Sequence, residues 1–125
     1  MRITNTTRGG IVAGRVASGD SFWAKFRGLM GRDELDPDEG LWLPDTSSIH
    51  MFFMRFPIDC LFVGGEEADG TRPVVGVRHA LPPWRGIVWY VRGAKGVVEL
   101  PPGALGRSAT AVGDRVRFED VPAAA

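Results

Sequence analysis

The sequence predicts a mainly β domain, either a compact β sandwich or a barrel, with one short amphipathic N-terminal helix; an α+β arrangement is the alternative. Seventeen glycines and nine prolines divide the 125 residues into short segments, which suits strands and turns better than long helices. Between these breaks lie apolar runs of the length of buried strands. Only residues 20–31 space their apolar side chains at the period of a helix.

The N-terminal third is predicted to hold two strands, the helix and a loop. Residues 1–18 suit two short strands around the turn at residues 8–10, with Gly14 as a bulge. Asp20 or Ser21 is a suitable N-cap for the helix, and Gly31 suits the position after its end. The apolar stripe of the helix is predicted to pack on a sheet. Residues 33–40 are rich in acidic side chains and read as a solvated loop without the calcium-binding pattern of an EF-hand.

The middle of the chain carries its most apolar segments. Residues 41–43 start a strand, and residues 48–59 are apolar on both faces of an extended chain, so this segment is predicted to be a strand covered on both sides. Pro57 has no N–H to donate, so the strand ends or bends there. Residues 58–63 form the next predicted strand. The glycine-rich and acidic residues 64–70 suit an exposed hairpin loop.

The remaining elements complete one core. Residues 74–77 return from the hairpin, residues 81–86 form a proline-stiffened turn, and further strands are predicted at residues 87–91, 97–100 and 114–118. No repeat or linker interrupts the chain. We expect a single domain over residues 1–121 and a frayed tail over residues 122–125.

Charge and composition exclude several classes of function. Fifteen basic and fifteen acidic residues cancel, although residues 1–70 carry a net charge of −4 and residues 71–125 a net charge of +4. A neutral chain lacks the basic surface that nucleic acids require, so we expect no nucleic-acid partner. No apolar run is long enough to span a bilayer, and no apolar stretch follows the charge at the N-terminus, so we expect a soluble cytoplasmic protein without a membrane partner.

His50 and Asp59 are polar residues in apolar surroundings. His50 begins the pattern His-Met-x-x-Met, which would suit a soft metal, but Met51 and Met54 fall on opposite faces of a strand. We therefore predict no metal and no other cofactor, and a hydrogen-bonded structural or ligand-contacting role for His50. Asp59 suits a turn cap or an ion pair; paired with His50 it would resemble a base and its orienting group. Cys60 is the only cysteine, which excludes an internal disulfide, and its apolar neighbours predict a buried, unreactive thiol.

A second group of candidates follows the strand at residues 74–77. Trp84 and Arg85 lie on the stiff turn, and two further aromatic residues follow at positions 89 and 90. Aromatic side chains beside an arginine on a rigid loop suit the binding of sugars, anions or a peptide, although they can also cap a sandwich. Charged residues expected to need a partner because they lie near apolar segments are the ion-pair candidates Arg27, Arg55, Asp59 and Glu99.

Five segments together resemble one family. They are Phe26-Arg27-Gly28-Leu29-Met30, Glu39-Gly40-Leu41-Trp42, residues 48–59, Glu99-Leu100-Pro101-Pro102-Gly103 and Val112-Gly113-Asp114. The chain is similar over nearly its whole length to the bacterial and archaeal family called domain of unknown function 192. The resemblance implies a compact β sandwich or barrel with a short helix, and it implies no particular activity. Many members resemble exported proteins with a signal peptide, from which this N-terminus departs.

Three hypotheses of function follow from these residues. The first is a small non-catalytic binding module for a small ligand or a protein, with a pocket near His50, Asp59, Trp84 and Arg85. The second is a structural or protein-interaction domain that pairs through a sheet edge. The third is an enzyme that uses His50 and Asp59 as acid and base, which the lack of a nucleophile motif makes the weaker reading. A cleft that collects the polar residues would favour the first and third.

Overall fold

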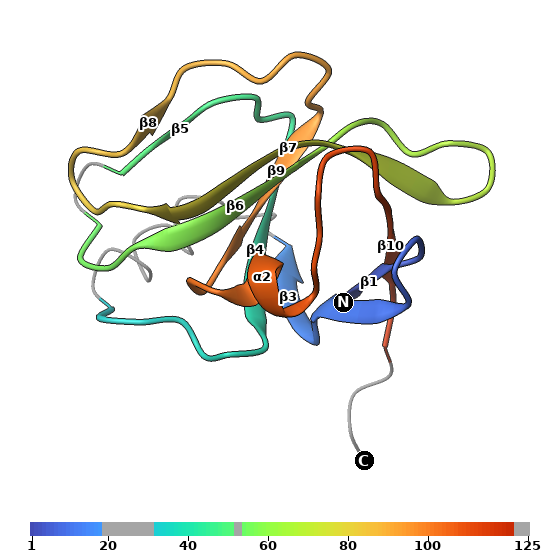
Figure 1. The fold of residues 1–125 in the computed structure, drawn as a ribbon, viewed down its shortest axis with the longest axis horizontal. Coiled ribbons are helices and arrows are strands. Elements are labelled where there is room, and N and C mark those ends of the chain that lie inside the picture. Colours follow the sequence, from blue (N-terminus) through green and yellow to red (C-terminus); the bar gives the residue numbers. More distant parts are fainter. Residues whose placement is uncertain (19–31, 52–53, 122–125) are drawn as a thin grey trace.

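The computed structural model describes residues 1–18, 32–51 and 54–121, and their architecture is mainly β, as predicted (Figure 1). The helix predicted at residues 20–31 lies outside the described residues; the helix that the structure places is α2 (Ala104–Arg107). The strands are β1 (Arg2–Asn5), β2 (Gly10–Ala13), β3 (Arg15–Ser18), β4 (Glu39–Pro44), β5 (Ile49–His50), β6 (Ile58–Val63), β7 (Thr71–Leu81), β8 (Ile87–Val88), β9 (Gly96–Leu100) and β10 (Arg115–Glu119).

Eight strands form one mixed sheet in the order β2-β1-β10-β7-β6-β9-β4-β3, and β5 pairs with β8 in a separate two-stranded sheet. The large sheet ends at β2 on one side and at β3 on the other, so it does not close, and the barrel form of the prediction is wrong. The physical reason lies at Gly14. There the chain passes from β2, at one edge of the sheet, to β3, at the other edge, without pairing the two strands and without forming the predicted bulge. The N–H groups of Gly14 and Arg15 both donate to the carbonyl of Asp38, so this corner is held by the loop before β4.

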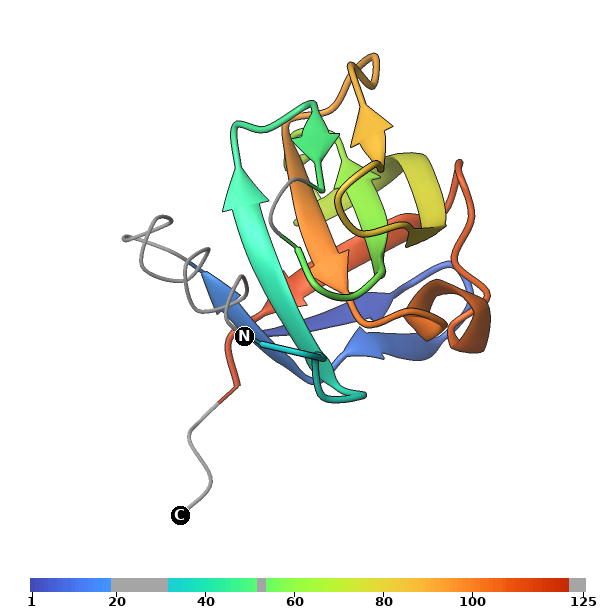
Figure 2. The same cartoon turned by 90° about the vertical axis from the view of Figure 1, so that its left-hand side faces the viewer.

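The central strands β4, β6 and β9 are buried on both faces. Every residue of β6 and β9 is buried, which is the burial that continuous apolar runs such as residues 58–63 predict. One face packs in a core that includes Ile3, Leu61 and Leu105. The opposite face packs in a core that includes Phe62 and Met51. Figure 2 shows the strands of the large sheet twisting steeply across one another, with the β5–β8 pair set apart from them.

A close approach between β4 and β9 explains one glycine. A Cβ atom at Gly96 would lie 2.1 Å from a ring carbon of Trp42, so no other residue fits beneath that ring without displacing it. The ring of Trp42 also meets Phe118 edge to face, with 4.8 Å between ring centroids, and the guanidinium of Arg72 lies 5.2 Å from its centroid. Trp42 thus joins β4, β7, β9 and β10 around one side chain.

The segment at residues 48–59 does not form one long strand, which corrects that prediction. Among the described residues of this segment, strand structure covers Ile49–His50 before β6 begins at Ile58. The N–H of Met51 adds one more bond to the ladder, to Gly86 (2.8 Å), and the backbone then turns, because the carbonyl of Met51 accepts from Met54 (3.2 Å) and Trp84 (2.7 Å). Both methionine side chains are still buried in the core. The apolar pattern therefore predicted burial correctly, but the buried residues belong to a loop.

Candidate functional site

The exposed aromatic side chains of the described residues gather between β7 and Val91. Trp84, Trp89 and Tyr90 are 55%, 82% and 66% exposed, and Ile87 between them is also exposed. We call these four residues the aromatic strip. Scattered single apolar residues on a surface are ordinary, but several large ones within seven positions mark a contact surface.

The turn that carries Trp84 is fixed by its own backbone. Trp84 adopts a φ of +66°, a left-handed conformation that costs a non-glycine residue on the order of 1 kcal/mol. Its N–H donates to Met51 (2.7 Å), and the N–H of Gly86 donates back to Pro82 (3.0 Å). A Cβ at Gly86 would lie 2.6 Å from that same Pro82 carbonyl. The turn therefore holds its exposed tryptophan in one place rather than leaving it on a loose loop.

The two-stranded sheet places His50 beside the strip. His50 lies opposite Ile87 and Ile49 lies opposite Val88 in an antiparallel ladder. Val88 is buried in the core whereas Ile87 is exposed, as the alternation of a strand requires. Figure 1 shows β5 and β8 together at the periphery of the molecule, on the side away from both termini. His50, Trp84 and Arg85 are all exposed and come from adjoining segments, so the structure brings three of the four predicted binding residues to one region.

Asp59, the fourth predicted residue, does not belong to this region. Its side chain points to the face of the sheet that packs on α2, the same face as Leu61, whereas Met51 and Val88 pack on the opposite face. It is fully buried, and its carboxylate accepts hydrogen bonds from the backbone N–H groups of Ala80 (2.8 Å), Gly103 (3.1 Å) and Leu105 (3.1 Å). Ala80 has a φ of +48° at a bulge where β7 gains one residue relative to β6. Asp59 therefore fixes the end of β7, just before the turn of Trp84, and joins it to α2. Its donors are backbone groups rather than the arginines Arg27 or Arg55 that were considered for it.

The remaining ion-pair candidates take different positions. Arg27 lies outside the described residues. Arg55 is exposed and lies 3.8 Å from the exposed carboxylate of Asp33, a distance at which the interaction is weak. Glu99 is buried, and Oε2 has no hydrogen-bond partner among the described residues. Burial raises the pKa of Glu99 to about 7.

Cys60 lies opposite Glu99 on the neighbouring strand and is fully buried, as the sequence predicts. Burial, and after it the charge of Glu99, raises the pKa of this thiol above its ordinary value. A thiol that resists ionisation is a poor nucleophile and a poor metal ligand. Across the residues that the structure describes, no three His, Cys, Asp or Glu side chains come together as metal ligands.

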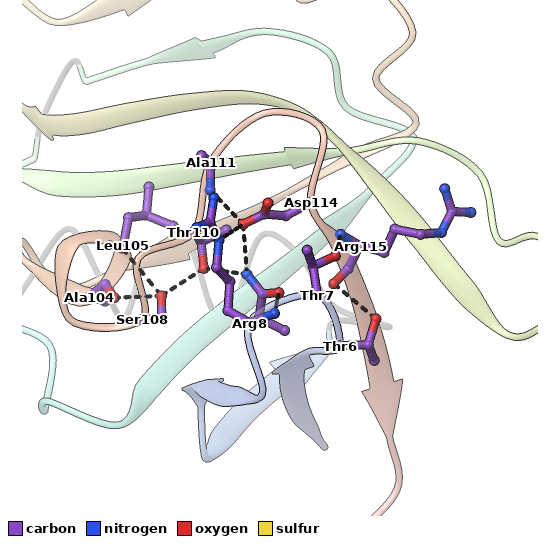
Figure 3. A network of polar contacts seen from close by, with 11 residues as sticks. Thr6, Thr7, Arg8, Ala104, Leu105, Ser108, Thr110, Ala111, Asp114 and Arg115 are labelled. Atoms are coloured by element: carbon purple, nitrogen blue, oxygen red, sulfur yellow. Dashed lines mark hydrogen bonds and ion pairs between the residues drawn. The ribbon is translucent and has the colours of Figure 1, made fainter.

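Another buried carboxylate, Asp114, lies in a polar network near α2 (Figure 3). Its Oδ2 accepts from the side chains of Asn5 and Arg8 and from the N–H of Ala111, each at 3.0 Å. The guanidinium of Arg8, which donates to it, lowers the pKa of Asp114 despite its burial. Asn5 donates to Thr110 as well, at 3.1 Å. This network ties the turn between β1 and β2 to the loop after α2.

A pocket of about 310 Å³ lies elsewhere, next to α2 and the start of β6. Its walls are mainly apolar and its rim carries charges of both signs; it is lined by Asp33, Glu34, Leu35, Pro37, Phe56, Pro57, Pro101, Pro102 and Arg107. None of the four predicted binding residues lines it. The structure thus does not collect the four predicted residues in one pocket: His50, Trp84 and Arg85 are exposed, whereas Asp59 is buried toward α2.

The sequence already suggests a binding role for Trp89 and Tyr90 beside Trp84 and Arg85, but it does not single out Ile87. The available signal was the alternation of Ile87, Val88 and Trp89, which puts the isoleucine and the tryptophan on the same face of an extended chain. Their exposure could not be read from this pattern, because either face could have been the buried one. None of the described helices is long and apolar enough to cross a membrane.

Comparison with known proteins places this fold among uncharacterised relatives. The family DUF192, described as "Uncharacterized ACR", matches residues 3–118. A "UPF0127 protein" of Thermococcus sibiricus is 36% identical and aligns over 94% of this chain and 74% of its own length. A "UPF0127 protein" of Pyrococcus furiosus is 34% identical, over 91% of this chain and 95% of its own length.

Two solved structures share the fold. One, titled as a putative transcription regulator from Sinorhizobium meliloti, has a TM-score of 0.69 and 22% identity, and covers 93% of this chain and 89% of that one. The other, a protein of unknown function from Novosphingobium aromaticivorans, has a TM-score of 0.65 and 24% identity, and covers 94% of this chain and 82% of that one. At these identities the likeness shows the fold alone.

Proposed function

The chain belongs to the DUF192 family, and we propose that it works as a non-catalytic binding module whose contact surface is the aromatic strip. The observation that carries this proposal is the exposure of Trp84, on a turn held by backbone hydrogen bonds, together with that of Trp89 and Tyr90 directly after β8. Burying three such side chains against a partner would contribute on the order of 5 kcal/mol. A turn that is already ordered does not have to lose much conformational freedom on binding.

The arrangement of the polar residues supports binding rather than catalysis. An acid–base pair needs a carboxylate within hydrogen-bond reach of the histidine or of the substrate. Asp59 is instead saturated by three backbone N–H groups inside the core, while His50 is exposed. Asp59 fixes the end of β7, just before the turn that carries Trp84.

The test is a selection of ligands on matched variants. A random displayed-peptide library and a glycan array are probed with the wild type and with the double variant Trp84→Ala/Trp89→Ala. The control variant, Ile11→Ala/Val112→Ala, removes exposed apolar side chains elsewhere on the surface. We expect ligands that bind the wild type and the control to lose most of their affinity for the strip variant. Ligands that bind all three proteins equally would place the contact surface elsewhere, for instance at the pocket beside α2.

A further inference from the structure

We propose that the partner of the aromatic strip is an extended acidic peptide segment that adds as a strand to the outer edge of β8. This inference rests on the proposed function and specifies the chemistry of its ligand. It follows from three independent features of the segment at residues 84–92: the direction of its backbone groups, its exposed side chains and its charge.

The first feature is the ladder of β5 and β8. In an antiparallel pair, the N–H and C=O groups of successive residues alternate between the partner strand and the opposite edge. Gly86 accepts from Met51, and Val88 lies opposite Ile49, so residues 86 and 88 face β5. The backbone groups of Ile87 and Trp89 therefore face away from it. Within the described part of the chain, β8 has no second strand beside it, and this edge is open for pairing.

The second feature is that the side chains beside this edge suit an added strand. Ile87 and Trp89 lie on the exposed face, and Trp84 and Tyr90 flank them. A strand that pairs with β8 would place alternate side chains over Ile87 and Trp89, at the distances where apolar and β-branched residues contact cross-strand aromatic ones. In this mode the backbone supplies affinity and the alternate side chains supply specificity.

The third feature is charge. Residues 78–95 contain Arg78, Arg85, Arg92 and Lys95, all exposed, and no aspartate or glutamate. Arg85 precedes β8 and Arg92 follows Tyr90, so the two arginines flank β8 in the sequence. The complementary segment thus has acidic residues at both ends and apolar or β-branched residues between them.

A peptide accounts for these features better than another polymer of the same charge. An acidic polysaccharide could stack on the tryptophans and pair with the arginines, but it has no regular row of amide donors and carbonyl acceptors. The open edge at Ile87 and Trp89 offers such a row. Only a second polypeptide backbone can satisfy it in register.

The experiment uses a defined peptide with the intact chain. The probe is an acetylated and amidated peptide of about nine residues, with two glutamates at each end and alternating valine and threonine between them. One control peptide replaces the glutamates by lysines, and another carries N-methyl groups on alternate residues, which removes the donors on one edge. An oligogalacturonate represents the acidic polysaccharides. Binding is followed by tryptophan fluorescence and calorimetry at low and high salt.

Protein variants separate backbone pairing from side-chain contact. Ile87→Pro removes the outward N–H of β8 without removing a donor to β5, and Ile87→Ala removes the same side chain but keeps that N–H. Circular dichroism establishes that both variants are folded. We expect the glutamate peptide to bind the wild type, to bind Ile87→Pro about tenfold more weakly than Ile87→Ala, and to weaken with salt. The N-methylated and lysine peptides should each bind at least about tenfold more weakly.

Other outcomes overturn the inference in distinguishable ways. Equal affinity for the plain and N-methylated peptides, with Trp84→Ala/Trp89→Ala still abolishing binding, would contradict strand addition and leave the aromatic strip as the contact surface. Binding of the oligogalacturonate but not of the glutamate peptide would identify a carbohydrate as the occupant. If the glutamate peptide bound none of the proteins, the inference of an acidic peptide partner would be rejected. The proposed function would still be tested separately, by the displayed-peptide library and the glycan array.

Discussion

Replacement of Asp59 by asparagine tests how the surface is supported. Asparagine keeps the shape of the side chain but turns one oxygen into an NH₂ group and removes the charge. In the folded protein Oδ1 accepts one hydrogen bond and Oδ2 accepts two, all from backbone N–H groups. In the less costly orientation, the NH₂ group faces the N–H of Ala80, and that buried donor loses its acceptor.

The cost can be worked out from these contacts. One buried N–H without an acceptor costs about 1–3 kcal/mol, and two hydrogen bonds change from charged to neutral acceptors, a loss of about 1 kcal/mol each. We therefore expect Asp59→Asn to lower the free energy of unfolding by about 3–5 kcal/mol. That is a large part of the 5–15 kcal/mol that typically stabilises a domain.

The assay is urea unfolding, followed by circular dichroism, of the wild type, Asp59→Asn and the matched control Asp33→Asn. Asp33 carries an exposed side chain, and its contact with Arg55 at 3.8 Å is weak, so the control should stay within about 0.5 kcal/mol of the wild type. If Asp59→Asn unfolded at the same urea concentration as the control, the three buried hydrogen bonds would not stabilise the fold, and the assignment of Asp59 as a support would be wrong.

Three further predictions concern the described core. Asp114→Asn should lower the free energy of unfolding by about 1.5–3 kcal/mol at pH 7. Because Arg8 lowers the pKa of Asp114, the difference in stability between wild type and variant should shrink as pH falls below about 3.9. Urea midpoints of both proteins at pH 7 and pH 3 measure this difference. Burial raises the pKa of Glu99 to about 7, above its unfolded value. The stability of the wild type should therefore fall, relative to that of Glu99→Gln, by up to about 3 kcal/mol between about pH 4.5 and pH 7. A constant difference in stability across that range would refute the shift. Gly96→Ala should cost at least about 1–3 kcal/mol because its methyl group meets the ring of Trp42, whereas Gly106→Ala, with no atom within 4 Å of the added Cβ, should be neutral or stabilising in thermal melts.

Several parts of the fold could be predicted because their cause is local. The apolar run at residues 58–63 has no polar face, so it had to lie inside a sheet, and the structure buries all of it as β6. Cys60 lies within this run, so its burial could be predicted for the same reason. The turn at residues 81–86 also follows from residues that restrict the backbone by themselves.

The candidate site depended on partners that are distant in sequence. The donors to Asp59 come from positions 80, 103 and 105, so the sequence around Asp59 indicated only that it needed donors, not which ones. The strand predicted at residues 48–59 gives way to a turn after β5 because the carbonyl of Met51 accepts from the N–H groups of Met54 and Trp84. The exposure of Trp84 follows from a left-handed backbone that its own residue type does not favour.

The most direct test of the central claim, that the edge of β8 and the aromatic strip form the contact surface, is amide hydrogen exchange measured by NMR with and without the glutamate peptide. We expect the amides of Ile87 and Trp89, which face away from β5, to exchange at least about tenfold more slowly when the peptide is bound. The amide of Val88, which already faces β5, should change little. Unchanged exchange at Ile87 and Trp89 under saturating peptide, or protection confined to the pocket around Phe56 and Arg107, would contradict it.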